Sequence, residues 1–377
     1  MAKKINTFIG VFFRQFIIFF PLNFLNDFQR KFTQFVFRRS TQFLLKIVSS
    51  KKNVRLDFSS DSYSMLVLLI ILLFTSIIFS CLIKKNWISR FLSITEYVCV
   101  MYLAVILIKY GIDKIFKTQF PEPESNILFT RLGNLDKDIL FWSTMGTSKM
   151  YNTIIGSIEL LSGILLLFRR SRFSGLLLTV ICFIQVSIIN ISFDISVKFF
   201  SLILLGMSIF LVRKNGWKLI LTMICFRDQT FFDRPLFLPY TTFFKVLILG
   251  FIFIKIAIPY FNNDLNSEGK KDSLGLTGAY KVTSSDTSYK YLFFHKDHYL
   301  IFMEKSSDKM ISFHYEISFD QHIIIEDDQH HISKHLLMKN QKDNTIIFSF
   351  NDRIIKAKAV DGKGMNALQD RFHILVD

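Results

Sequence analysis

The sequence predicts a polytopic α-helical membrane protein that carries a small antiparallel β domain at its C-terminal end. Three observations predict it. The chain is 51% hydrophobic and only 20% charged, against about 25% charged residues in an average soluble domain. Several mainly apolar stretches before residue 263 reach the length of about 20 residues that crosses a bilayer core. Beyond residue 264, apolar and polar residues alternate as they do in half-buried strands.

The charge divides the chain at the same place. Residues 1–263 hold 31 Lys and Arg against 13 Asp and Glu, a net charge of +18, whereas residues 264–377 hold 15 against 17, a net charge of −2. All eight His lie in the second part and all four Cys in the first. We therefore predict three regions: an N-terminal helix with a basic amphipathic segment (1–61), a membrane helix bundle (62–263) and a β-rich domain outside the membrane (264–377).

Six stretches are long and apolar enough to be membrane spans. They are Ser64–Ile83, Thr95–Ile112, Met150–Phe168, Phe173–Ile191, Val197–Val212 and Phe243–Tyr260. A weaker seventh stretch, Asn6–Phe24, holds Arg14 and Gln15 near its middle. It is either a span with a polar interior or a helix lying in the membrane interface. No small-residue cleavage site follows it, so we do not expect a removable signal peptide.

The Lys and Arg residues of the turns predict the orientation, because short cytoplasmic loops are enriched in them. Basic residues gather in the turn 84–90, the turn 169–172 and the segment 213–234. If the strong spans alternate, all three segments fall on one side, which is then cytoplasmic. The turn Ser192–Ser196 and the region Phe116–Lys149 lie outside, and the last span leads residues 264–377 outward.

Residues 25–61 depart from this charge pattern, because eight basic residues stand there against three Asp on the predicted outer side. Phe, Leu and Ile residues are interleaved with the basic ones at a rough helical spacing. We interpret this segment as an amphipathic helix on the outer membrane surface, with its basic side on anionic headgroups. The alternative places residues 1–61 wholly inside and reverses every loop. The expected headgroup contacts are Arg30, Lys31, Arg38 and Arg39.

The C-terminal region predicts a β-meander, in the form of a small half-barrel or a sandwich. The candidate strands are Gly278–Thr283, Tyr291–His295, Tyr299–Met303, Ile311–Ser318, His322–Ile325, Ile346–Phe350 and Arg353–Ala359. The polar run from Glu326 to His335 lies between strands. His331 and His335 would be metal ligands on one face of a helix, but we interpret the run as a solvated loop and expect no metal site.

Ionisable residues at membrane depth are costly and are functional candidates for that reason. Glu159 lies in the middle of a predicted span, so it must face the bundle and find a partner or stay protonated. Lys114 and Arg131 are the candidate partners. Lys109 and Asp113 are four residues apart on one helix face, which predicts a pair within that helix.

A second polar set repeats every four residues, at Asn190, Asp194 and Lys198. On one continuous helix these residues would form a polar stripe; we favour an outer turn between two helices, where polar groups cap the helix ends. The two sets together form either a polar intramembrane pocket, for a quinone, a lipid headgroup or a proton, or a structural network that fixes helix packing. We favour the structural network.

Several kinds of chemistry have no motif in this sequence. It contains no Walker loop, no G-x-S-x-G and no G-x-G-x-x-G. No C-x-x-C is present, which disfavours a thiol redox pair. No predicted span holds a His, which disfavours haem in the spans and leaves a quinone as the cofactor to consider. Because membrane loops account for the positive charge, we expect no nucleic-acid partner.

Three motifs resemble the DoxX-like integral membrane family, in the long form typical of Bacteroidota. The first is the run Tyr110–Phe120, and the other two are Gly156, Glu159, Leu160, Leu161 and Gly163 leading to Arg170, and Asn190, Phe193, Asp194, Val197, Lys198, Phe200 and Ser201. The resemblance covers about residues 94–212. It implies a bacterial inner-membrane protein with a four-helix core, extra spans before it and a small periplasmic β domain after it.

The resemblance implies little about activity, because some relatives are linked to quinone or thiol redox systems and many have no known role. Three functions stay open. The first is a non-catalytic envelope subunit or scaffold whose β domain, residues 264–377, contacts a protein partner. The second is a quinone-linked oxidoreductase subunit, and the third is a carrier of a lipid or small hydrophobic molecule through the polar pocket.

Overall fold

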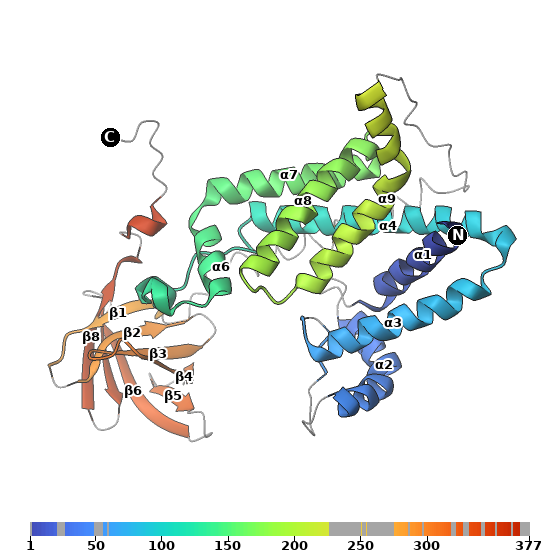
Figure 1. The fold of residues 1–377 in the computed structure, drawn as a ribbon. Coiled ribbons are helices and arrows are strands. Elements are labelled where there is room, and N and C mark those ends of the chain that lie inside the picture. The colour runs from blue at the N-terminus through green and yellow to red at the C-terminus, as the bar shows by residue number, and fades with distance from the viewer. Residues whose placement is uncertain are drawn as a thin grey trace. The chain divides into compact units, whose positions relative to one another are not determined.

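A computed structural model describes residues 2–20, 27–48, 56–58, 60–225, 250, 254, 275–285, 287–295, 298–317, 322–326, 332–340, 344–350, 353–362 and 365–369 (Figure 1). The chain forms two compact units. The first unit combines Met1–Phe116 with Thr153–Pro259, and the second combines Lys117–Asn152 with Tyr260–Asp377. The connection between two helices of the first unit therefore belongs to the same unit as the C-terminal domain.

Helices build the first unit. They are α1 (Ala2–Phe19), α2 (Asp27–Val48), α3 (Tyr63–Leu82), α4 (Ile88–Ile115), α7 (Lys149–Leu167), α8 (Arg172–Ser192) and α9 (Lys198–Cys225), with the short 3-10 turn η2 (Lys85–Trp87) before α4. Ser62 starts α3, because its hydroxyl oxygen accepts a hydrogen bond from the backbone N–H of Met65 at 3.1 Å.

Within the described residues, four helical segments are long and apolar enough to cross a membrane: α3, the run Lys85–Ile115, α7 and α8. They confirm four of the predicted spans as helices. The prediction at Val197–Val212 falls in α9 and that at Asn6–Phe24 begins in α1, but neither helix is among these four. The sixth predicted span, Phe243–Tyr260, lies outside the described residues apart from Gly250 and Ile254.

The surface of these helices is apolar to an extent unusual for a protein facing water. Large apolar side chains stay exposed on α3 and α8, including Phe74, Ile78, Phe79, Ile181 and Ile188. On the other side, the helices share a core that includes Phe16, Leu68, Leu103, Leu107 and Met207. Outward apolar faces are what a lipid environment favours, so the helical unit has the character of a membrane bundle.

The turns between the helices lie at two opposite ends of this bundle. α4 and α7 are antiparallel neighbours, since Gly111 lies against Gly156 while Ala104 lies against Gly163. The basic turns 84–90 and 169–172 are therefore at the same end. At the other end, the carboxylate of Asp61 accepts hydrogen bonds from the backbone N–H groups of Lys198 and Phe199, at 2.7 and 3.0 Å. Asp61, which precedes α3, thus caps the N-terminus of α9.

The end of α1 lies beside the start of α9, because the ring of Phe20 stacks on that of Phe200 with centroids 4.8 Å apart. From there α2 follows. The side-chain amide of Gln29 donates to the carbonyl oxygens of Ile17 and Ile18 at 3.1 and 3.0 Å, which satisfies carbonyls that the end of α1 leaves open. The start of α2 and Asp61 therefore both lie at the bundle end opposite the basic turns.

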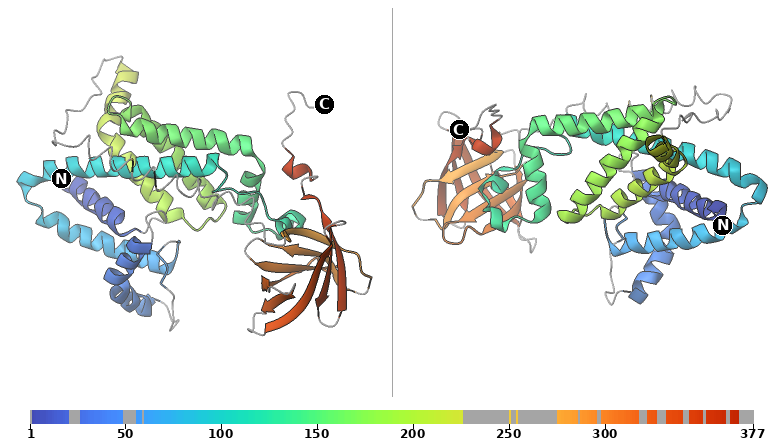
Figure 2. Two further views of the ribbon diagram at one scale, coloured as in Figure 1. Left: turned by 180° about the vertical axis from the view of Figure 1, so that it is seen from behind. Right: turned by 45° about the horizontal axis from the view of Figure 1, so that its top comes forward.

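The C-terminal part of the second unit is a closed barrel of eight strands, each paired antiparallel with the next. The strands are β1 (Gly278–Val282), β2 (Tyr289–Phe294), β3 (Tyr299–Glu304), β4 (Met310–Ile317), β5 (His322–Glu326), β6 (Ile332–Asn340), β7 (Thr345–Phe350) and β8 (Arg353–Val360). β8 pairs with β1, with Ala279 opposite Val360. The left view of Figure 2 shows the strands curving round until these two meet.

Large side chains fill the barrel interior. Alternate residues point inward, and they are buried: Tyr280, Leu292, Phe294, Leu300, Phe302, Tyr315, Ile323, Ile346 and Ile355. The ring of Phe294 meets those of Tyr280 and Tyr315 edge-on, with centroids 5.5 and 5.6 Å apart. This packing matches small eight-stranded barrels whose interior is occupied by their own side chains.

The observed sheet differs from the prediction in two ways. The sheet closes, whereas the sequence predicted a half-barrel or sandwich, because pairing between the first and last strands is not visible in local alternation. β6 was also missed, since Ile332–Asn340 was treated partly as a polar loop; pairing with β5 and β7 makes it a strand. His335 lies in β6, not on a helix, and burial lowers its pKa, opposed by a backbone hydrogen bond at Ser349.

The connection 117–152 packs against the outside of the barrel. It contains α5 (Ser125–Phe129), the 3-10 turn η3 (Leu132–Asn134) and α6 (Lys137–Thr147). The ring of Phe129 contacts those of Tyr291 and Phe293, with centroids 4.5 and 5.5 Å apart. Arg131 pairs with Asp308 at 2.5 Å. The connection 117–152 and the barrel therefore belong to one compact unit.

Replacing Phe129 by Ala should detach the connection 117–152 from the barrel. The side chain is half-buried, so we expect the contact to lose about 1–3 kcal/mol, less than a fully buried Phe would cost. Limited proteolysis of the purified full-length protein would show faster cleavage within residues 117–152. Leu132→Ala is the matched control, because Leu132 is largely exposed, and it should leave the cleavage rate unchanged. Equal rates for both variants would contradict this docking.

Candidate functional site

A glycine seam brings two of the predicted polar residues together. A Cβ atom built on Gly156 would lie 2.6 Å from the carbonyl oxygen of Gly111, and one built on Gly111 would lie 2.7 Å from that of Gly156. At Gly163 a Cβ would lie 2.8 Å from Cγ1 of Ile108. Small residues allow helix backbones to approach this closely, a common arrangement between membrane helices. α4 and α7 are therefore in direct backbone contact along this seam.

Beside the seam, Lys114 of α4 and Glu159 of α7 form a buried ion pair. Nζ of Lys114 donates to Oε2 of Glu159 at 2.7 Å, and the two side chains are only 7% and 5% exposed. The ammonium group also lies 5.7 Å from the ring centroid of Tyr110, within reach of a cation–π attraction. Of the two candidate partners for Glu159, the structure selects Lys114, while Arg131 pairs with Asp308 on the barrel.

The remaining predicted residues form local pairs. Lys109 and Asp113 make the expected bond within α4. Asn190 is buried near the end of α8, Asp194 lies in the following turn with a φ of 55°, and Lys198 begins α9. Lys198 pairs with Asp194 at 2.6 Å. The three residues thus belong to a turn between helices and do not form one polar stripe, and they do not join the Lys114–Glu159 pair.

The sequence did not predict two further polar contacts. Arg213 of α9 pairs with Glu96 of α4 at 2.9 Å. The guanidinium of Arg14 stacks 4.2 Å from the ring centroid of Phe91 and donates to its carbonyl oxygen at 3.2 Å. Arg14 gave the only hint, as a charged residue within an apolar run, whereas Glu96 and Arg213 are 117 residues apart and no local pattern relates them.

The expected headgroup contacts lie on α2. Lys31, Arg38 and Arg39 are exposed and line an open pocket of about 950 Å³ with Gln34, Phe35, Gln42 and Leu56. Arg30 is in the same helix. This pocket is separate from the Lys114–Glu159 pair, so the structure distinguishes a buried helix–helix contact from a solvent-accessible basic surface. Among the described residues, no group of three His, Cys, Asp or Glu side chains is placed to hold a metal ion.

Taken together, the fold and these contacts define a class: a multi-helix protein of membrane-bundle character joined to a small antiparallel β-barrel. Among the described residues of the bundle, the buried charges are paired: Lys114 with Glu159 between two helices, and Asp113 with Lys109 within α4. Comparison with known proteins adds no relative, because no family model, no curated protein and no solved structure matches the chain.

Proposed function

We propose that this chain is a non-catalytic subunit or scaffold of a complex in the bacterial inner membrane, and that its periplasmic β-barrel binds a protein partner. The observation that carries the proposal is the filled barrel interior. Tyr280, Phe294, Phe302 and Tyr315 occupy the centre of the barrel, so the barrel offers its outer surface for binding. Part of that surface already holds the connection 117–152 through Phe129.

The polar residues of the bundle support a structural role for the helices. Lys114 and Glu159 are buried against each other beside a glycine seam in which backbones touch. A quinone or lipid pocket at this place would need space next to Glu159, and its observed neighbours are the packed residues of α4. The ion pair satisfies two charges that would otherwise be costly in the bundle.

A patch on the outer face of β7 and β8 is the proposed partner surface. Ile347 and Ile354 are exposed there, while their neighbours Ile346 and Ile355 point into the barrel. The register places Ile347 opposite Lys356 and Ser349 opposite Ile354, so the two exposed Ile are diagonal neighbours on one face. A small apolar patch of this kind suits the apolar core of a contact with a protein partner.

Purification in mild detergent tests this function. We expect the wild-type protein to retain a stoichiometric protein subunit, and Ile354→Glu to lose it, because a charge would enter the apolar contact. Ser312→Glu is the control: it places the same charge at an exposed position of β4 and should keep the subunit. A purified protein that carries a quinone or a lipid and no protein subunit would overturn the scaffold proposal.

The proposed orientation is supported by the basic turns 84–90 and 169–172, which share one end of the bundle and which the positive-inside rule places in the cytoplasm. The connection 117–152, which packs against the barrel, follows the end of α4 and precedes the start of α7 in the chain, whereas the basic turns precede α4 and follow α7. We therefore expect a tag after Asp377 to be cleaved by protease added to intact spheroplasts, and a tag in the turn 169–172 to be protected. Protection of the C-terminal tag would reverse the orientation.

A further inference from the structure

The helix α2 carries an exposed surface that the scaffold function does not use. Its buried residues recur every four positions and face the protein: Gln29, Thr33, Phe37, Thr41 and Leu45. Phe37 meets the ring of Phe19 edge-on, with centroids 4.8 Å apart, and Gln29 caps the carbonyls of α1. α2 is therefore fixed on the bundle by one face, which leaves its other faces in a defined orientation.

One of the outward faces is apolar. Phe35 is 86% exposed, and Phe43, Val36 and Phe32 are exposed as well. On a helical wheel Phe32, Val36 and Phe43 fall within one narrow sector, because they are separated by four and seven residues. Four large apolar side chains on the outside of a 22-residue helix are costly in water, so this face indicates an apolar environment.

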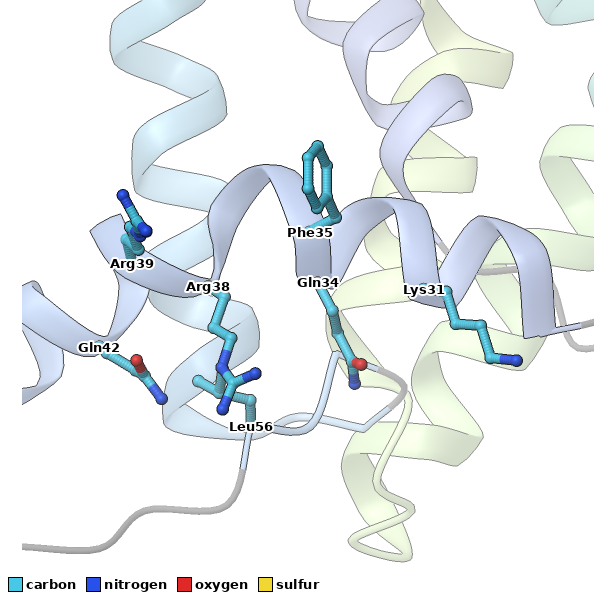
Figure 3. A pocket seen from close by; sticks show the side chains of 7 residues that line it. All are labelled: Lys31, Gln34, Phe35, Arg38, Arg39, Gln42 and Leu56. Carbon is cyan, nitrogen blue, oxygen red and sulfur yellow. The ribbon is translucent and has the colours of Figure 1, made fainter.

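Basic residues adjoin this apolar face: on the helical wheel Lys31 and Arg38 lie beside it, and Arg39 falls within it, between Phe35 and Phe32. Lys31, Arg38 and Arg39 line the pocket together with the amides of Gln34 and Gln42, and the lining contains no Asp or Glu. Figure 3 shows Arg38 extending from α2 toward Leu56. Within the described part of the chain, none of these three cations is in an ion pair with a carboxylate. The pocket is therefore a set of donors with a net positive charge and no internal anion.

We propose that this surface of α2 binds an anionic phospholipid. The phosphate group of the lipid lies beside Arg38, whose guanidinium group donates charge-assisted hydrogen bonds to its oxygens, while Lys31 and Arg39 add positive charge along the same surface. The glutamine amides supply further donors. Phe35 and the neighbouring exposed apolar side chains enter the region where headgroups meet acyl chains, as in helices that lie in the membrane interface.

The two adjacent faces select a lipid over other anions. A free phosphate would use the cations but would leave Phe35, Phe43 and Val36 in water. An acidic protein would need to cover both faces along the length of α2. A lipid surface satisfies both at once, since it presents phosphate groups directly beside hydrocarbon. Asp61 caps the N-terminus of α9 at the same end of the bundle. α2 therefore lies at an end of the helices and not at their middle.

Native mass spectrometry of the full-length protein, titrated with phosphatidylglycerol or phosphatidylcholine, tests the site. The wild type should bind phosphatidylglycerol preferentially. Replacing Lys31, Arg38 and Arg39 by Gln should lower that preference roughly fivefold for each charge removed, since one Lys or Arg near an anionic surface contributes about 1 kcal/mol. The control replaces Lys281, Lys305 and Lys358 on the barrel by Gln; these residues are exposed, so the variant removes the same charge and should leave lipid binding unchanged.

A second variant reports the depth of the apolar face. Phe35→Trp, in nanodiscs with brominated lipids, should be quenched more strongly by brominated phosphatidylglycerol than by brominated phosphatidylcholine, after subtraction of the signal from the three native Trp. High salt should reduce the difference, because it screens the headgroup attraction. Equal quenching by both lipids, displacement of the lipid by inorganic phosphate, or an unchanged preference in the triple α2 variant would overturn the proposal.

Discussion

Replacing Glu159 by Gln is expected to destabilise the helix bundle by about 3–5 kcal/mol, because it leaves the buried ammonium group of Lys114 without its counter-charge. The Lys114–Glu159 pair is 7% and 5% exposed, so water does not replace the lost partner. Unfolding of the purified protein in detergent, followed by the loss of helical signal, measures the change.

Two variants show whether the ion pair itself is responsible. The double variant Lys114→Met with Glu159→Leu removes both charges and should recover most of the stability, because an apolar pair of similar size is often neutral or better than a buried ion pair. Asp194→Asn is the control: Asp194 also pairs with a Lys but is largely exposed, so its loss should cost about 0–1 kcal/mol. If the Glu159→Gln variant instead keeps the stability of the wild type and loses its function in the cell, that result would indicate a chemical role for Glu159.

Replacing Gly156 by Ala is expected to destabilise the bundle by about 1–3 kcal/mol, the cost of overpacking a close contact. The new Cβ would lie 2.6 Å from the carbonyl oxygen of Gly111 and 2.9 Å from Cβ of Lys114. Since backbone atoms cannot move aside, α4 and α7 must separate, and that separation also stretches the Lys114–Glu159 pair. Unfolding of the purified protein in detergent measures the loss of stability.

Gly206 provides a control of opposite sign. A Cβ at Gly206 would meet only Cζ of Phe13, at the ordinary contact distance of 3.8 Å, and Ala is favoured over Gly in a helix interior by about 1 kcal/mol. Gly206→Ala in α9 should therefore leave stability unchanged or raise it. If both substitutions raised stability, the close approach of α4 and α7 would not be present in the protein.

Local patterns predicted the parts of this fold whose cause is local. Long apolar runs identified α3, α4, α7 and α8, because a helix of that composition needs little more than its own length to be recognised. The pair Lys109–Asp113 followed from a separation of four residues on one helix. Phe residues interleaved with Lys and Arg at a rough helical spacing predicted the basic exposed surface of α2, and these residues do lie on one helix.

The sequence by itself therefore predicted the apolar helices, most of the strands and the charged residues that need partners. Only the tertiary structure decided which partners they have. Glu159 had two candidate cations, and the glycine seam between α4 and α7 brings Lys114 to it. The closure of the barrel between β1 and β8 and the packing of Phe129 on the barrel could not be predicted from the sequence either. The physical reason is the same in each case: these contacts join residues 45 to 164 positions apart, and they are set by packing across elements, which no local spacing encodes.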